Sequence, residues 1–180
     1  MDVSDFLDRL FACACAGCGG AGGAFCARCV PAEAAAGRLM LHGLTVHALG
    51  NYEGGLRRAV LALKRGRRDV GRALGAALAA RFAHELRPHD VLVPVPTTRA
   101  RRLERGFNQS ALLAEAVARH ATLGVLDALG RVEGAPQQGR DRDERLGAAG
   151  RFRAGRPEIV GETSVVIVDD VVTTGATLRD

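Results

Sequence analysis

Two short, almost entirely apolar runs, at 90–96 and 165–168, dominate the hydrophobic pattern of the chain. The second run is Val-Val-Ile-Val, and the first ends in a Pro-x-Pro turn. Apolar runs of this length without polar alternation are typical of parallel strands. We therefore predict a parallel sheet in which residues 165–168 form a central strand, buried on both faces.

Helical periodicity fills much of the chain before the first of these runs. Leu56, Val60 and Leu63 are three to four positions apart and predict a helix that ends near Lys64. A second helix is predicted at 70–86. The weaker signals before these helices predict a helix at 1–10, an alanine-rich connector at 31–43 and a strand or hairpin arm at 44–52. Those after the first apolar run predict a basic loop at 97–110 that opens into a helix, and a strand at 123–129. A long exposed loop, with room for a hairpin, is predicted at 131–156. The whole pattern indicates an α/β fold with helices flanking a parallel sheet.

The composition suits one globular domain with a small appendage. The chain has 180 residues, of which 47% are hydrophobic and only 4% aromatic, so Ala, Leu and Val must fill the core. No apolar run approaches the length of a membrane span, and the first ten residues are acidic where a secretory signal is basic. We therefore expect a cytoplasmic protein without membrane insertion.

The basic residues are almost all arginine. A net charge of +5 favours polyanions or phosphorylated small molecules, without distinguishing between them. Of the 25 basic residues, Lys64 is the one lysine. Two interpretations of Lys64 remain open. It is either a solvated residue that complements the dipole at its helix end, or a compact charge directed at a phosphate or an acid. The five histidines are scattered, and we assign none of them a role.

Two Cys-x-x-Cys pairs lie near the N-terminus, Cys15 with Cys18 and Cys26 with Cys29. Four thiolates on two glycine-rich turns suit tetrahedral Zn²⁺. Disulfides are the competing interpretation, but a cytoplasmic location argues against them. The sequence therefore predicts a structural zinc module within residues 1–43, with Cys13 as an alternative to Cys15.

The second apolar run is followed by two acids and a small polar cluster. The acids are Asp169 and Asp170, and the cluster consists of Thr173, Thr174, Gly175, Ala176 and Thr177. Open α/β sheets bind ligands at the carboxyl ends of their strands. A turn of this kind offers backbone N–H groups, hydroxyls and a helix N-terminus to a phosphate. Carboxylates bind sugar hydroxyls directly or through Mg²⁺.

These residues resemble the phosphoribosyl-pyrophosphate (PRPP) signature of type I phosphoribosyltransferases. The resemblance implies that the acids meet the ribose hydroxyls and that the loop surrounds the 5-phosphate. Further motifs precede it: the cysteine pairs, a Tyr-x-Gly…Arg…Lys pattern at 52–64, Val-Pro-Val-Pro at 93–96, and Arg-Gly-Phe-Asn-Gln-Ser at 105–110. Together they resemble the ComF family of amidophosphoribosyltransferase-like competence proteins.

The resemblance implies roles for further residues. Those expected at the pyrophosphate site are Pro94, Val95, Pro96, Arg99, Arg101 and Arg105. Those expected in a flap over PRPP are Gln137, Gln138 and Arg145. Residues 44–180 would form a phosphoribosyltransferase-like domain that is truncated, since the family continues through a helix and another strand. Residues 146–150 lack the asparagine that the family usually has there.

Three functions are compatible with the sequence. The first is a phosphoribosyltransferase that uses PRPP and Mg²⁺, with an unspecified acceptor and no evident general base. The second is an accessory protein that binds single-stranded DNA or DNA-uptake proteins without turnover, although few aromatic rings are available to stack on bases. The third is an inactive fold retained for protein contacts.

Overall fold

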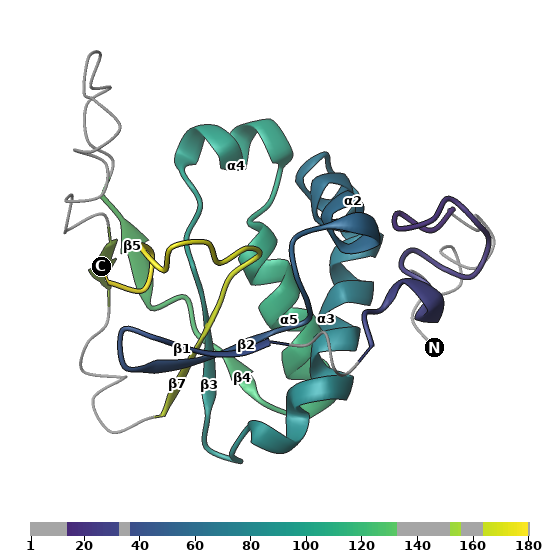
Figure 1. The fold of residues 1–180 in the computed structure, drawn as a ribbon. Coiled ribbons are helices and arrows are strands. Elements are labelled where there is room, and N and C mark those ends of the chain that lie inside the picture. Colours follow the sequence, from purple (N-terminus) through teal and green to yellow (C-terminus); the bar gives the residue numbers. More distant parts are fainter. Residues whose placement is uncertain (1–13, 33–36, 133–151, 156–163, 180) are drawn as a thin grey trace.

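The computed structural model describes residues 14–32, 37–132, 152–155 and 164–179, and a three-stranded parallel sheet lies at its centre (Figure 1). The strand order is β4 (Gly124–Val125), β3 (Val91–Pro94), β7 (Val165–Val168). Leu92 pairs with Val166 on one side and with Val125 on the other. The predicted strands at 90–96 and 165–168 and their parallel arrangement are therefore confirmed.

The position predicted for β7 is wrong. Within the described ranges β7 pairs only with β3, and it is β3 that occupies the centre of the sheet. Alternate residues of a strand face opposite sides of the sheet. Val166 and Val168 pack against the helices, whereas Val165 and Ile167 are 39% and 43% exposed. The all-apolar run therefore forms a strand that is buried on one face, where the sequence predicted burial on both.

Helix α5 (Gln109–Ala121) packs directly against this sheet, α3 (Arg68–Phe82) packs against α5, and α2 (Gly54–Lys64) packs against α3. The predicted inward face of α2 is confirmed, since Ala59, Val60 and Leu63 are buried. The predicted helix at 70–86 consists of α3 followed by the 3₁₀ helix η3 (Ala83–Glu85). Leu92 of β3 packs with α3 and α5 in a cluster of buried residues. The helices thus fix the strand from which the carboxyl-end turns begin.

The contact between α3 and α5 depends on two glycines. A Cβ built on Gly71 would lie 2.6 Å from Leu112 Cδ2, and one on Gly75 would lie 3.0 Å from the carbonyl oxygen of Leu113 and still closer to Ala116 Cβ. Both glycines are buried, and they are four residues apart, on one face of α3. Their missing side chains let the backbones of the two helices approach.

The basic segment at 97–110 is not the loop that the sequence predicted. Residues Arg99–Arg105 form a helix, α4, because the Thr98 side chain accepts a hydrogen bond from Arg101 N and Gly106 ends the helix at φ 75°. Asn108 then caps α5 by accepting from Ser110 N at 3.2 Å. Its Nδ2 also donates to the carbonyl oxygen of Val95 at 3.0 Å, which ties α5 to the end of β3.

Two antiparallel pairs complete the fold. β1 (Gly37–Leu41) pairs with β2 (Leu44–Ala48), where the sequence predicted a connector followed by a hairpin arm. The expected domain boundary at residues 43 and 44 thus falls in the turn of this hairpin. β5 (Leu129–Arg131) pairs with β6 (Phe152–Ala154), so an antiparallel pair stands near the two ends of the segment for which the sequence predicted a long loop. The predicted strand at 123–129 is shorter than expected, because β4 ends at Val125 and β5 belongs to this other pair.

Several predictions fall outside the described residues, namely the helix at 1–10, Cys13 and the flap residues Gln137, Gln138 and Arg145. Within the described ranges, no helix combines the length and the apolar character that crossing a lipid bilayer requires.

We expect Gly75→Ala to destabilise the protein. Alanine favours the helix by about 1 kcal/mol, but a methyl group forced against Ala116 and the Leu113 carbonyl costs about 1–3 kcal/mol. Gly71→Ala is the matched comparison, because its nearest atoms are the mobile ends of leucine side chains. Urea unfolding should rank Gly75→Ala below Gly71→Ala in free energy of unfolding. Equal or reversed values would contradict the close helix contact.

Candidate functional site

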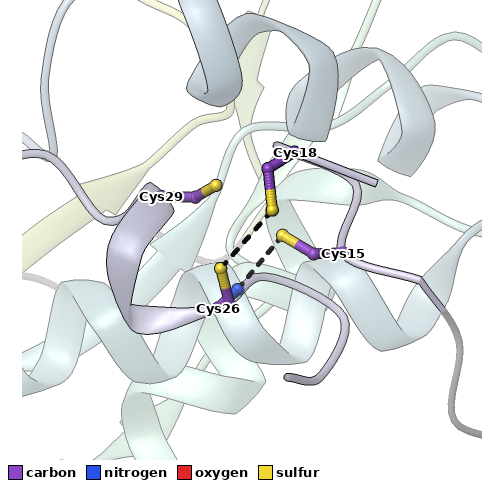
Figure 2. A group of neighbouring side chains, drawn as sticks. All are labelled: Cys15, Cys18, Cys26 and Cys29. Atoms are coloured by element: carbon purple, nitrogen blue, oxygen red, sulfur yellow. Dashed lines mark hydrogen bonds between the residues drawn. The ribbon is translucent and has the colours of Figure 1, made fainter. Parts of the chain in front are cut away.

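Four cysteine side chains converge beside α2 (Figure 2). The sulfurs of Cys15, Cys18, Cys26 and Cys29 all lie within 4.8 Å of one another. The Sγ atoms of Cys18 and Cys26 are 3.8 Å apart. Tetrahedral thiolates around zinc are separated by about 3.8 Å, given Zn–S bonds of about 2.3 Å. The structure therefore brings together the four cysteines named from the sequence, in a set that could hold a metal ion such as zinc.

The four thiols are not electrostatically equivalent. Burial raises the pKa of Cys15, but backbone hydrogen bonds outweigh it and lower the value to about 6. The N–H groups of Gly17 and Cys26 each donate to Cys15 Sγ at 3.3 Å. At Cys29, burial and then contacts with the other sulfurs raise the pKa to about 12. A cation among the sulfurs would remove this opposition, because it stabilises every thiolate at once.

The cysteine segment is fastened to the neighbouring helices by arginines. Arg58 Nε of α2 donates to the carbonyl oxygen of Gly17 at 2.6 Å, and Arg67 Nη1 donates to that of Ala14 at 2.9 Å. Gly17 leaves room for the cluster, since a Cβ there would lie 2.7 Å from Cys29 Sγ. Cys15 and Cys26 are also part of the buried core. The cysteine cluster and α2 therefore form one packed unit.

A second group of polar side chains gathers at the carboxyl ends of β3 and β7. Asp169 and Asp170 follow β7 directly. Asp169 Oδ1 accepts from Ser110 Oγ at 2.9 Å and from the backbone N of Asp170 at 2.8 Å. The N–H of Val95 donates to the Val168 carbonyl at 2.9 Å, which continues the strand pairing up to the acids.

Lys64 reaches this group from the last position of α2. Its Nζ lies 2.9 Å from Asp170 Oδ2, and the two side chains are 29% and 16% exposed. This contact favours the second of the two interpretations that the sequence left open. Lys64 is directed at an acid of the candidate site and is not merely a solvated residue at a helix end.

A polar cavity of about 300 Å³ opens beside these acids. Five of the residues expected to bind PRPP or pyrophosphate line it together with Asp169 and Asp170: Val95, Pro96, Arg101, Arg105 and Thr177. Arg101 and Arg105 share one face of α4 because they are four residues apart. The cavity therefore combines two carboxylates on β7 with cationic side chains on α4.

The other predicted ligand residues do not line this cavity. Pro94 is buried within β3, and Arg99 lies elsewhere on α4. Thr173 and Thr174 are exposed, and residues 173–178 form turns where the sequence predicted the start of a helix. Their turn closes with a hydrogen bond from Leu178 N to the Gly175 carbonyl at 2.9 Å.

Gly175 is buried beneath the β1–β2 turn. It adopts φ 71°, and a Cβ there would lie 3.1 Å from His42 Nε2. His42, to which the sequence assigned no role, itself has φ 52° in the turn between β1 and β2. The glycine thus lets the hairpin approach the loop after β7.

Sequence reasoning assigned no role to several residues that line the polar cavity. Asn108, Gln109 and Ser110 belong to the Arg-Gly-Phe-Asn-Gln-Ser motif, yet their contacts with Val95 and Asp169 depend on how α5 packs. The motif itself was the available signal. Phe107 of the same motif carries Arg68 over its ring, 4.9 Å from the centroid, so it joins α3 to this region.

A second cavity, of about 250 Å³, shares Asp169 and Asp170 with the first. Its walls are mostly aliphatic and come from the β1–β2 hairpin and from α2, α3 and α5. They include Val46, Leu56, Val60, Leu74 and Val171. The acids therefore stand between a polar space and an apolar one.

The two acids interact unfavourably with each other. Burial raises the pKa of Asp169, and the neighbouring charge of Asp170 raises it further. The hydrogen bonds from Asp170 N and Ser110 and the charge of Lys64 lower it, but they do not offset the first two effects. An ionised Asp169 therefore costs folding free energy, which is typical of a site arranged for binding rather than for stability.

We expect Asp169→Asn to stabilise the fold at pH 7, because asparagine retains an acceptor oxygen and carries no charge. The pKa of Asp169 is raised in the folded state, so the wild type loses stability as pH rises above the ordinary carboxyl range, near pH 4. Thermal melts from pH 3.5 to 8 should show the two proteins converging at low pH and diverging at high pH. A constant difference would mean that the effect does not come from this ionisation.

Comparison with known proteins identifies relatives of part of the chain. No protein-family profile and no solved structure matches it. Competence protein ComFC of Bacillus subtilis is 37% identical over 91 residues, which are 51% of this chain and 36% of that protein. Competence protein F of Haemophilus influenzae is 31% identical over 106 residues, which are 56% of this chain and 46% of that protein.

These matches cover less than half the length of either relative. The names of both relatives agree with the family that the sequence resembles. These two competence proteins support the resemblance to the ComF family that the sequence motifs indicate.

Proposed function

We propose that this chain is a cytoplasmic, phosphoribosyltransferase-like protein that binds PRPP, or a related phosphorylated ribose, together with Mg²⁺. The observation that carries the proposal is the polar cavity, in which two adjacent carboxylates face Arg101, Arg105 and Lys64. A ligand with a sugar diol at one end and phosphates at the other is complementary to that distribution of charge.

The residues divide the binding between them. Asp169, held by Ser110, and Asp170 would accept hydrogen bonds from ribose hydroxyls. Arg101 and Arg105 would bind the pyrophosphate, where charge develops if it leaves. Thr177 and the turn at residues 173–178 would bind the 5-phosphate.

The carboxylates also fit Mg²⁺, which prefers oxygen ligands of this kind. When bound, Mg²⁺ would supply neutralisation of the pyrophosphate charge. Gln137, Gln138 and Arg145 stay candidates for a flap, and residues 44–180 stay the predicted ligand-binding domain. An acceptor that displaces pyrophosphate would occupy the aliphatic cavity beside the acids.

The second candidate function is an accessory role in DNA uptake, through single-stranded DNA or a protein partner. Its supporting observation is α4, on which Arg99, Arg101 and Arg102 are exposed. The names of the two relatives connect them to competence, and we extend that connection to this chain. Under this proposal the cavity binds a ligand without turning it over.

We also propose that Cys15, Cys18, Cys26 and Cys29 bind one structural Zn²⁺. Support comes from sulfur spacing that matches tetrahedral zinc and from backbone N–H groups that favour the Cys15 thiolate. A site with four protein thiolates leaves no open position for catalysis, so its role would be to hold the segment against α2.

Metal analysis of protein purified without chelator should give one zinc per chain, and Cys15→Ser should lose it. Because Cys15 packs in the core, the variant should also melt at a lower temperature. Cys13→Ser is the matched control and should retain zinc, since Cys13 lies outside the proposed ligand set. Absence of zinc from the wild type would remove this proposal.

The double substitution Asp169→Asn with Asp170→Asn should weaken PRPP binding in the presence of Mg²⁺ by about tenfold or more, since charged hydrogen bonds are lost. Calorimetry measures the affinity, and Asp127→Asn, an exposed aspartate outside the cavity, is the control. A parallel titration with single-stranded DNA at rising salt tests the second candidate, whose affinity should fall steeply. Unchanged PRPP affinity in the double variant would refute the acid site.

A further inference from the structure

We infer that Lys64 is a positioning residue that exchanges partners: it holds Asp170 in the ligand-free protein and transfers to a phosphate when the ligand enters. The inference rests on the proposed function for the identity of the ligand. It does not rest on it for the first state, in which Lys64 Nζ lies 2.9 Å from Asp170 Oδ2.

Helix packing holds the backbone of Lys64 in place while leaving its side chain free to move. The preceding residue, Leu63, is completely buried in the core. The helix end is closed by hydrogen bonds from Arg65 N and Gly66 N to carbonyl groups of α2. The Lys64 side chain is 29% exposed and lies in the wall of the polar cavity. A fixed base and an open side give the ammonium group a range of positions within that cavity.

In the ligand-free protein the ammonium group of Lys64 contacts the Asp170 carboxylate, where a metal ion would otherwise bind. Asp169 and Asp170 are adjacent carboxylates directly after β7. Lys64 compensates one of the two charges. A divalent ion approaching the acids alone must therefore compete with an ammonium group that is already in contact with Asp170.

A phosphorylated ligand changes this balance. Lys64, Arg101 and Arg105 line the same cavity, so a phosphate there offers the ammonium group a second anion within its reach. Transfer of Lys64 to that phosphate would leave Asp170 to accept from ribose hydroxyls or to meet the divalent ion that accompanies the ligand. Carboxylate and cationic groups would then each contact the ligand instead of each other.

This exchange explains why lysine stands at position 64 in a chain whose other basic residues are arginine. A guanidinium group is planar and forms two parallel hydrogen bonds with a carboxylate, which would fasten it to Asp170. An ammonium group on a flexible stem makes weaker, less directional contacts and can change partners.

The test uses Lys64→Met, Lys64→Arg and the control Arg65→Met on the full chain. Arg65 is the exposed neighbour of Lys64 and does not line the cavity, so its replacement removes the same charge without the contact. Mn²⁺ alone, followed by electron paramagnetic resonance, serves as the probe of the free acids. PRPP with Mg²⁺, followed by calorimetry, serves as the probe of the exchange.

Lys64→Met should bind Mn²⁺ alone roughly tenfold more tightly than the wild type, because a partly buried counter-charge is removed. Lys64→Arg should leave Mn²⁺ affinity unchanged. Both variants should weaken PRPP binding by about tenfold. Lys64→Met loses the contact with the phosphate, and Lys64→Arg stays bound to Asp170. Thermal melts should show Lys64→Arg at least as stable as the wild type, which keeps that variant informative if Lys64→Met folds poorly.

Two results would overturn the inference: Mn²⁺ affinities that are equal in Lys64→Met and Arg65→Met, or PRPP affinity in Lys64→Arg that equals the wild type. Failure of the wild type to bind PRPP is a different outcome. It would reject the proposed ligand and with it the second state, while the Mn²⁺ measurements would still decide the first.

Discussion

Parallel pairing of β3 with β7 is the constraint on which both the fold and the candidate site depend. It places the carboxyl ends of the two strands at one edge of the sheet, where Val95 N donates to the carbonyl oxygen of Val168, 73 positions later in the sequence. Much of the polar cavity then comes from the segments that follow these strands: Pro96 and α4 after β3, and the two acids after β7. Asn108 strengthens this arrangement, since one amide both begins α5 and binds the end of β3.

The sequence predicted the elements whose signals are local. Apolar runs located β3 and β7, helical spacing located α2 and α3, and cysteine spacing located the four thiols. The position of β7 could not be derived from its composition, because Val165 and Ile167 differ from Val166 and Val168 in what lies beside them and not in their chemistry. The helix α4 was missed because five of its seven residues are charged, whereas its caps, Thr98 and Gly106, were the informative positions.

The site residues also divide into those with a local sequence signal and those whose role depends on packing. The acids could be named because they directly follow an apolar strand. Ser110 and Lys64 could not be assigned to those acids, since their contacts span 59 and 106 positions of sequence and depend on packing. The scarcity of lysine singled out Lys64 as unusual, but only the arrangement of α2 against β7 identified its partner.

The helix α2 has a consequence for how the two parts of the molecule behave together. Near its start, Gly55 and Arg58 contact the cysteine segment, and at its last residue Lys64 contacts Asp170. Arg58 and Lys64 are separated by about 9 Å along the helix axis, and a helix of this length is stiff. In mechanical terms α2 is a rod with one end anchored in the sulfur cluster. A displacement of this rod along its axis would carry the base of the Lys64 side chain with it.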